Sequence, residues 1–188
     1  MVELVVSICV MLVLTAMAIP SLMRSMRTYQ LNSAAASVSD MLKFTRFEAV
    51  RRNTPINFLA QANALGWVVG TDSNNSGAID ATEKQQLITG YPTLLVYASP
   101  PIPGANVIST ALGGATLTPL SGSNSSVTFD ARGAVRQGIN GGLAVNPYVF
   151  YVGNANDSDS GYRAVVLLPS GSVQIWTAPQ GGPWRRVG

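Results

Sequence analysis

The chain has 188 residues, enough for one domain with a core, and only 11% of them are Asp, Glu, Lys or Arg. It contains no histidine and a single cysteine, Cys9, which excludes Ser-His-Asp and Cys-His catalytic sites, His-based zinc sites and an intrachain disulfide. The net charge of +3 comes from residues 1–52, which carry six basic and three acidic side chains, whereas residues 53–188 carry six of each and offer no broad basic face for nucleic acid.

The first predicted element is an apolar helix at the N-terminus. Twenty uncharged residues run from Leu4 to Met23, about the number that an α-helix needs to cross a bilayer. A cleaved signal peptide is the alternative, but the segment lacks both a preceding basic region and a small-x-small cleavage site. We therefore expect residues 1–23 to be retained as a transmembrane or filament-core helix segment, with Cys9 as a small packed residue.

Residues 24–53 are predicted to continue this helix as an amphipathic segment that ends at Thr54-Pro55, because the residue before a proline disfavours the α conformation. The joined helix would be roughly 75 Å long at about 1.5 Å per residue. Pro20 removes one backbone hydrogen bond, so we expect a kink or local unwinding at residues 16–20. Apolar residues recur mostly at steps of three and four, which predicts one apolar stripe. The stripe comprises Met26, Tyr29, Leu31, Ala34, Ala35, Val38, Met41, Leu42, Phe44, Phe47 and Val50.

One carboxylate, Glu3, lies at the start of the uncharged run. A charged side chain in the hydrocarbon region costs about 2.5–3.5 kcal/mol on insertion scales, so an unpaired acid there is unfavourable. Pairing with an ammonium group of a neighbouring chain would offset that cost and fix the axial register of assembly. The alternative is that Glu3 lies among the lipid headgroups.

The N-terminal segment as a whole resembles that of type IV pilins and type II secretion pseudopilins. The resemblance is carried by VELVV, an apolar run ending in AIPS, and the long amphipathic continuation, and it covers roughly residues 1–50. It implies that Glu3 pairs with the processed, methylated N-terminal amine of a neighbouring subunit in a filament core, with Pro20 loosening the helix. In this family a basic leader and two further residues usually precede the position of Met1.

From Thr54 onward the period of the apolar residues changes from about 3.6 to two, which predicts strands. Residues 54–188 are therefore expected to form a β-rich globular head, with one or two antiparallel sheets packed on the C-terminal half of the helix. The fold class is α+β. Residues 99–125 are expected to be a long exposed loop with short extended pieces. The predicted strands are 55–60, 65–71, 85–89, 93–98, 126–130, 147–152, 162–168 and 172–177.

Three segments of the head extend the resemblance to the H-type minor pseudopilins and FimT-like minor pilins, the GspH/FimT-like family. They are GWVVGTDSNNSGAIDATEKQQL, SVTFDARGAV and a terminal hairpin, AVVLLPSGSVQIW. The resemblance implies a pilin fold, in which a long N-terminal helix packs on an antiparallel sheet or sandwich-like head.

A polar loop follows the second predicted strand. Its sequence, DSNNSGAIDATE, spaces oxygen-bearing residues as in an EF-hand, with Gly77 at the sharp turn and Glu83 as the closing bidentate ligand. Strands are predicted on both sides, where an EF-hand has helices. The loop is therefore either a Ca²⁺ site or a metal-free hairpin loop rich in Asp, Asn and Gly, and the flanks favour the second. The candidate ligands are Asp72, Asn74, Ser76, Ala78 through its carbonyl, Asp80 and Glu83.

The C-terminal PWRRVG places Trp184 beside Arg185 and Arg186. An aromatic ring next to guanidinium groups can stack on bases and contact phosphates. Some FimT-like proteins bind DNA during uptake through C-terminal arginines, which implies the same role for these residues. The alternative is a solvated tail pinned by Trp184, and the zero net charge of residues 53–188 does not favour nucleic acid.

Together, these features predict a structural subunit and not an enzyme. We expect it to insert in the inner membrane as a single pass with the head outside the cytoplasm. It would then assemble with copies of itself and other pilin-like subunits into a helical pilus or pseudopilus, periplasmic or extracellular. The alternatives are a DNA-binding minor pilin for DNA uptake and a tip pseudopilin of a type II secretion system. No cofactor is predicted apart from the candidate Ca²⁺.

Overall fold

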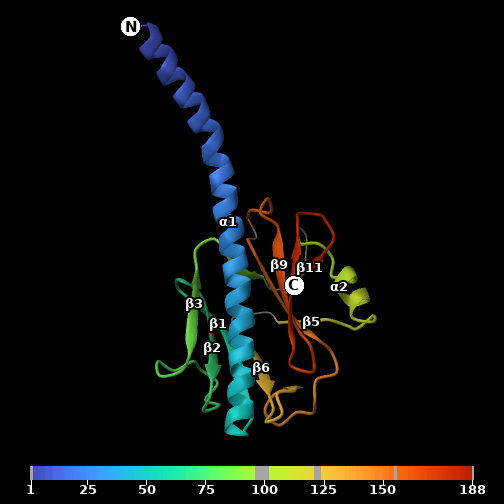
Figure 1. The fold of residues 1–188 in the computed structure, drawn as a ribbon. Helices are drawn as coiled ribbons and strands as arrows, with labels where there is room; N and C mark the ends of the chain where they lie inside the picture. Colours follow the sequence, from blue (N-terminus) through green and yellow to red (C-terminus); the bar gives the residue numbers. More distant parts are fainter. Residues whose placement is uncertain (1, 96–101, 121–123, 155, 188) are drawn as a thin grey trace.

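The computed structural model describes residues 2–95, 102–120, 124–154 and 156–187. One helix, α1 (Val2–Arg52), forms a stem, and its second half lies against a head built from two sheets (Figure 1). The first half of α1 projects beyond the head. This architecture confirms the predicted α+β fold class, a long N-terminal helix packed on antiparallel sheets.

The helix α1 continues through Pro20. The local unwinding that the sequence led us to expect at residues 16–20 does not occur in this described segment. Figure 1 shows α1 curving as it leaves the head, so the backbone accommodates the proline by bending. Two hydroxyls in the apolar half are satisfied within the helix. Ser7 Oγ donates to the Glu3 carbonyl at 2.8 Å, and Thr15 Oγ1 donates to the Met11 carbonyl at 2.7 Å. Neither hydroxyl therefore carries the cost of an unpaired polar group in an apolar environment.

The first sheet has the strand order β3-β2-β1-β6-β7, and all its neighbouring strands are antiparallel. The central strand β1 follows the end of the stem directly and pairs with both β2 and β6. The strands are β1 (Ile56–Asn63), β2 (Gly66–Asp72), β3 (Gln85–Thr89), β6 (Asn124–Phe129) and β7 (Val135–Arg136).

The second sheet has the order β11-β10-β9-β8-β4, and β5 makes a short parallel pair with β8. The predicted hairpin between β9 and β10 turns at residues 169–172. Gly171 there has a φ of 81°, and a Cβ at this position would lie 2.1 Å from the Gly133 carbonyl oxygen, so only glycine fits. The strands are β4 (Thr93–Leu95), β5 (Thr118–Pro119), β8 (Tyr148–Gly153), β9 (Tyr162–Leu167), β10 (Val173–Ala178) and β11 (Arg185–Val187).

The main core lies between the stem and the two sheets. Leu31, Val38 and Leu42 of α1 are fully buried there. Phe58 from the first sheet and Phe150 from the second meet in this core with ring centroids 5.4 Å apart in an edge-to-face arrangement. The stem therefore covers the line along which the two sheets meet.

The eight predicted strands are present, with ends that shift by up to three residues within the described chain. Residues 96–98 of the fourth predicted strand lie outside the described residues. Alternation of apolar residues was a sufficient signal for these strands because one face of each sheet is buried.

Residues 99–125 were predicted to form a long exposed loop with short extended pieces; β5 is such a piece, but the prediction missed a helix and buried residues in the described part. A short helix, α2 (Asn106–Ala111), lies in this segment, and its Ile108 is fully buried. Ile108 packs in a second cluster with Tyr151, Tyr162 and Trp176, which point away from the stem. The second sheet therefore has apolar side chains on both faces, and this segment covers the outer one. Residues 99–101 and 121–123 lie outside the described residues.

Candidate functional site

The apolar half of the stem is an uncovered apolar surface. None of its most apolar stretch is buried, and α1 is long and apolar enough to cross a membrane. Val2 is 77% exposed and Met17 is 73% exposed. A surface of this kind is stable only in lipid or against other apolar surfaces.

Glu3 lies in the first turn of this exposed half. Its backbone carbonyl is engaged by Ser7, and its carboxylate forms no ion pair within the part of the chain that the structure describes. Pro20 lies at the other end of the apolar half. Glu3 and Pro20 therefore lie on the same projecting segment, 17 positions apart in the helix, which is about 25 Å at about 1.5 Å per residue.

The apolar residues of the embedded half divide between two faces, so the prediction of a single stripe is wrong. Leu31, Ala34, Ala35, Val38, Met41 and Leu42 face the head and are buried. Tyr29 is 74% exposed and Phe47 is 62% exposed, and Met26 and Val50 are exposed as well. Exposed polar residues, among them Ser33, Asp40 and Lys43, separate these outward apolar side chains, so beside the head they are single apolar positions and not one continuous surface.

The embedded half is fixed to the head by polar contacts at three levels. Near the top of the head, Arg27 forms an ion pair with Asp157 and lies 5.3 Å from the ring centroid of Tyr91. At the lower end, Arg46 Nε donates to the Gly133 carbonyl at 3.0 Å. Between these levels lies Asn32, whose side chain accepts a hydrogen bond from Arg163.

Arg163 is a cation held in the interior with neutral partners. It is 6% exposed, its Nε donates to Asn32 Oδ1 at 2.6 Å, and its Nη1 donates to the Tyr162 carbonyl at 3.0 Å. Burial lowers the pKa of Arg163 below its ordinary value. Among the described residues no carboxylate pairs with Arg163. The dipoles of the Asn32 amide and the Tyr162 carbonyl therefore compensate for the burial of its charge.

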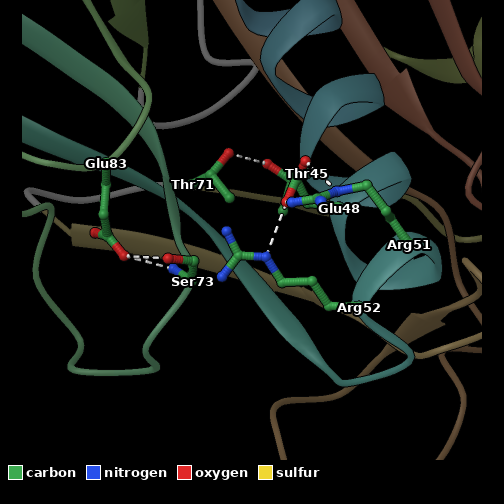
Figure 2. Close-up of polar contacts among 7 residues, drawn as sticks. All are labelled: Thr45, Glu48, Arg51, Arg52, Thr71, Ser73 and Glu83. Atoms are coloured by element: carbon green, nitrogen blue, oxygen red, sulfur yellow. Dashed lines mark hydrogen bonds and ion pairs between the residues drawn. The ribbon is translucent and has the colours of Figure 1, made fainter.

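The C-terminal end of the stem carries a second charged cluster, shown in Figure 2. Arg51 Nη2 and Arg52 Nε lie 2.7 and 2.9 Å from Glu48 Oε2, and Glu48 is 7% exposed. The hydrogen bond from Arg51 lowers the pKa of Glu48 below 4.5, against the opposing effect of burial, and Arg52 adds to the lowering. Both arginines also lie at a helix C-terminus, where cations interact favourably with the helix dipole.

The β2–β3 loop brings the candidate calcium ligands into one loop but satisfies them with its own donors. Asp72 is fully buried, and its two carboxylate oxygens accept bonds from the N–H groups of Ser76 and Gly77, each at 2.9 Å. Asn74 Nδ2 donates to Asp80 Oδ2 at 2.8 Å, and Ser76 Oγ donates to the Ala78 carbonyl at 3.1 Å. This pattern closes the loop without a metal.

Glu83 closes the same loop from its far end (Figure 2). Its Oε1 accepts bonds from the N–H group and hydroxyl of Ser73 at 2.6 and 2.9 Å, and its Oε2 accepts from the Asp80 N–H at 3.1 Å. Burial raises the pKa of Glu83, but these hydrogen bonds outweigh it and hold that pKa below 4.5. Within the described residues, no group of three or more Asp, Glu, Cys or His side chains is placed to hold a metal.

The C-terminal residues 185–187 form a short strand, β11, that is exposed and follows the buried Trp184. Trp184 is 2% exposed, its ring centroid lies 5.9 Å from that of Tyr151, and its Nε1 donates to the Pro103 carbonyl at 3.1 Å. Arg185 and Arg186 follow on β11 and are exposed. Adjacent residues of a strand point to opposite faces, so these two guanidinium groups diverge.

The contacts between stem and head were missed by sequence reasoning because their partners are far apart in the chain. Arg163 and Asn32 are 131 residues apart, and Arg27 and Asp157 are 130 apart. One signal was available for Arg163: it is the only charged residue in the apolar strand sequence YRAVVLL. A charge at that place indicates a buried polar contact.

Comparison with known proteins places this arrangement in a family. Two crystal structures of the type IV minor pilin FimU from Pseudomonas aeruginosa share the fold. The first has a TM-score of 0.52 and 17% identity and covers 81% of this chain and 96% of that chain. The second has a TM-score of 0.50 and 17% identity and covers 80% and 99%. A search of curated proteins finds no match.

A family model described as type II transport protein GspH matches residues 34–171. The matched region contains most of the embedded stem and most of the head, and it confirms the resemblance to the GspH/FimT-like proteins. Because this match spans more than half of the sequence, the chain belongs to the GspH family of pilin-like type II transport proteins.

Proposed function

We propose that this chain is a structural subunit of a helical type IV-type filament, a pilus or a pseudopilus. Residues 1–23 insert in the inner membrane as a single pass, with the head outside the cytoplasm. Residues 24–53 continue the stem, residues 54–188 form the head, and the assembled filament is periplasmic or extracellular. The family is one of pilin-like structural subunits and not a class of enzymes, which supports this function.

The observation that carries the proposal is the projecting half of α1, a membrane-length apolar helix that the rest of the chain leaves uncovered. Beside the head the stem also exposes the aromatic side chains of Tyr29 and Phe47. In lipid, helices associate through close packing and polar contacts, because lipid tails are as apolar as the helices themselves. Parallel packing of these stems would cover the projecting halves, and an ion pair between Glu3 and a neighbour's N-terminal amine would set their stagger.

The first prediction concerns Glu3. We expect Glu3→Ala to remain in the membrane fraction, because the change removes a charge from an apolar segment. Loss of a pair worth about 1.4 kcal/mol would lower the assembly constant about tenfold. Filament yield, measured by electron microscopy and by quantifying the sheared extracellular or periplasmic fraction, should fall accordingly.

The matched control is Asp159→Ala, which removes an exposed acid from the head and should leave filament yield unchanged. Wild-type filament yield from Glu3→Ala would contradict the proposed role of this acid. Mass spectrometry of the filament subunit provides an independent check, since removal of residues 1–23 from the mature protein would contradict filament assembly through this helix.

A DNA-binding minor pilin is the alternative favoured by one observation, the exposed Arg185 and Arg186 at the edge of the second sheet. Binding through phosphates would weaken steeply with added salt, and it would be lost when both arginines are changed to Ala.

A further inference from the structure

Each sheet of the head ends in a strand whose outer edge is unpaired among the described residues. The edge strands are β3 and β7 in the first sheet and β11 and β4 in the second, and of these four β3 and β11 lie on opposite sides of the stem in Figure 1. An unpaired strand edge presents backbone N–H and C=O groups to any extended segment that approaches it. Two such edges on opposite flanks are suited to a contact between successive copies of a chain.

The direction of β3 relative to the stem follows from its neighbours. Lys84, just before the strand, lies 4.3 Å from the ring centroid of Phe44, near the lower end of the stem. Thr89, at the end of the strand, lines a groove together with Tyr29 and Ser33, nearer the upper end. The strand β3 is therefore antiparallel to α1.

The strand β11 runs the other way. Its neighbour β10 begins beside Gly171, which lies against Arg46 of the stem, and ends at the level where Arg163 contacts Asn32. Because β11 is antiparallel to β10, it is parallel to α1. Through its pairing with Thr177, Arg185 lies at the level of Asn32, which is also the level of Thr89 on the opposite flank.

The two edges differ in charge in a way that selects their partner. If the β11 strands of two copies paired antiparallel, the arginines of one copy would lie opposite the arginines of the other. Like charges in opposed positions destabilise a strand pair. On β3, the sequence QQLIT carries no charge. A groove of about 190 Å³ between β3 and the stem is lined by the polar side chains of Gln30, Ser33, Ser37 and Gln86. These groups offer oxygen acceptors to a guanidinium group.

We propose that β3 of one copy pairs antiparallel with β11 of a second copy when their stems lie parallel, joining the two heads into a continuous sheet. This inference rests on the proposed function, because filament assembly is what aligns the stems. The contact uses two different surfaces and leaves one of each free, so it propagates as an open helical polymer and does not close into a dimer. The arginines of β11 exclude self-pairing, and the one that points to the stem side of the joined sheet enters the polar groove of the neighbour.

Disulfide trapping in the full-length protein tests this pairing. In a Cys9→Ser background, one copy carries Thr89→Cys and a co-expressed, differently tagged copy carries Arg185→Cys, the two positions that lie at the same level, with Leu87→Cys and Gln86→Cys covering staggered registers. Directly opposed residues of antiparallel strands bring Cα atoms within disulfide range. We expect oxidised filaments to contain a mixed dimer with one copy of each kind. The control pairs Thr89→Cys with Ser170→Cys, an exposed position in the β9–β10 turn, and should give none.

A second variant keeps the test independent of thiol geometry. Leu87 is 44% exposed, so Leu87→Lys should leave the unfolding temperature unchanged while its charge repels β11, reducing filament yield about tenfold. Leu65→Lys, at a 70% exposed position in the β1–β2 turn, is the matched control. Filaments that form normally without mixed dimers and with Leu87→Lys would overturn the strand pairing and leave the proposed function intact. Failure of the wild-type chain to enter any filament would overturn both.

Discussion

Three charged side chains, Glu48, Asp72 and Arg163, are buried among the described residues. Each is compensated differently: Glu48 by two arginines, Asp72 by backbone N–H groups, and Arg163 by an amide and a carbonyl oxygen. Removing one partner of a buried charge destabilises the fold by about 3–5 kcal/mol, because the remaining charge is left uncompensated. These contacts hold the stem, the β2–β3 loop and the second sheet in place.

Glu48 predicts a pH dependence of stability at the end of the stem. Its pKa is lower in the folded protein than its ordinary value of 4.5, so it stabilises the fold above that value and loses the contribution as the pH falls through the folded pKa. We expect Glu48→Gln to lower the free energy of unfolding by about 1 kcal/mol at pH 7, discounted because both arginines are half exposed. The difference between variant and wild type should shrink below pH 4, as measured by denaturant unfolding in detergent.

Asp40→Asn provides the control for Glu48→Gln. Asp40 forms only an exposed ion pair with Lys43 at 3.4 Å, and exposed pairs contribute little. This variant should match the wild type at both pH values. A destabilisation by Glu48→Gln that is equally large at pH 7 and pH 3 would contradict an electrostatic origin.

At the level of elements, whether the β2–β3 loop binds Ca²⁺ can be tested at Glu83. Glu83→Gln should lower stability by about 1 kcal/mol without metal, because it weakens the bonds that Glu83 accepts from Ser73 and Asp80. The calcium hypothesis adds that millimolar Ca²⁺ raises the unfolding temperature of the wild type and not of this variant. The metal-free hypothesis predicts no shift in either protein. Asp159→Asn serves as the control for removal of an acid elsewhere on the head.

The elements that sequence reasoning identified are those with a repeated pattern. The stem and eight strands are long enough for a period of 3.6 or two to be recognised. In contrast, α2, β5, β7 and β11 have two to six residues each, too few for a period. Their form depends on tertiary contacts, such as the packing of Ile108 and Trp184 against the outer face of the second sheet. The contacts of Glu48 and Arg163 were missed for a related reason, since adjacency in space is not visible in a single sequence.

At the level of the whole molecule, the head has a third layer outside the second sheet. Trp184 joins β11 to the segment that contains α2, through its ring contact with Tyr151 and its bond to Pro103. Trp184→Ala should cost about 3–5 kcal/mol, the usual range for a buried aromatic residue. Limited proteolysis should then cut residues 102–120 faster, while the stem contacts persist.

Trp184→Phe removes the hydrogen bond to the Pro103 carbonyl and keeps an aromatic ring, so it distinguishes the contribution of the bond from that of the ring. It keeps most of the buried apolar area and should cost about 1 kcal/mol, the net value of one hydrogen bond. Denaturant unfolding of both variants gives the comparison. A cost for Trp184→Ala no greater than that of Trp184→Phe would show that the ring does not hold this layer.

The three levels of contact between stem and head have a mechanical consequence. Arg27, Asn32 and Arg46 lie at three heights along the same helix and contact different parts of the head. Tension along the axis of the stem therefore loads these three contacts in shear. Because they bear the load at the same time, they do not break one after another. Under such a pull, the helix beyond the head would stretch before the head detached from it.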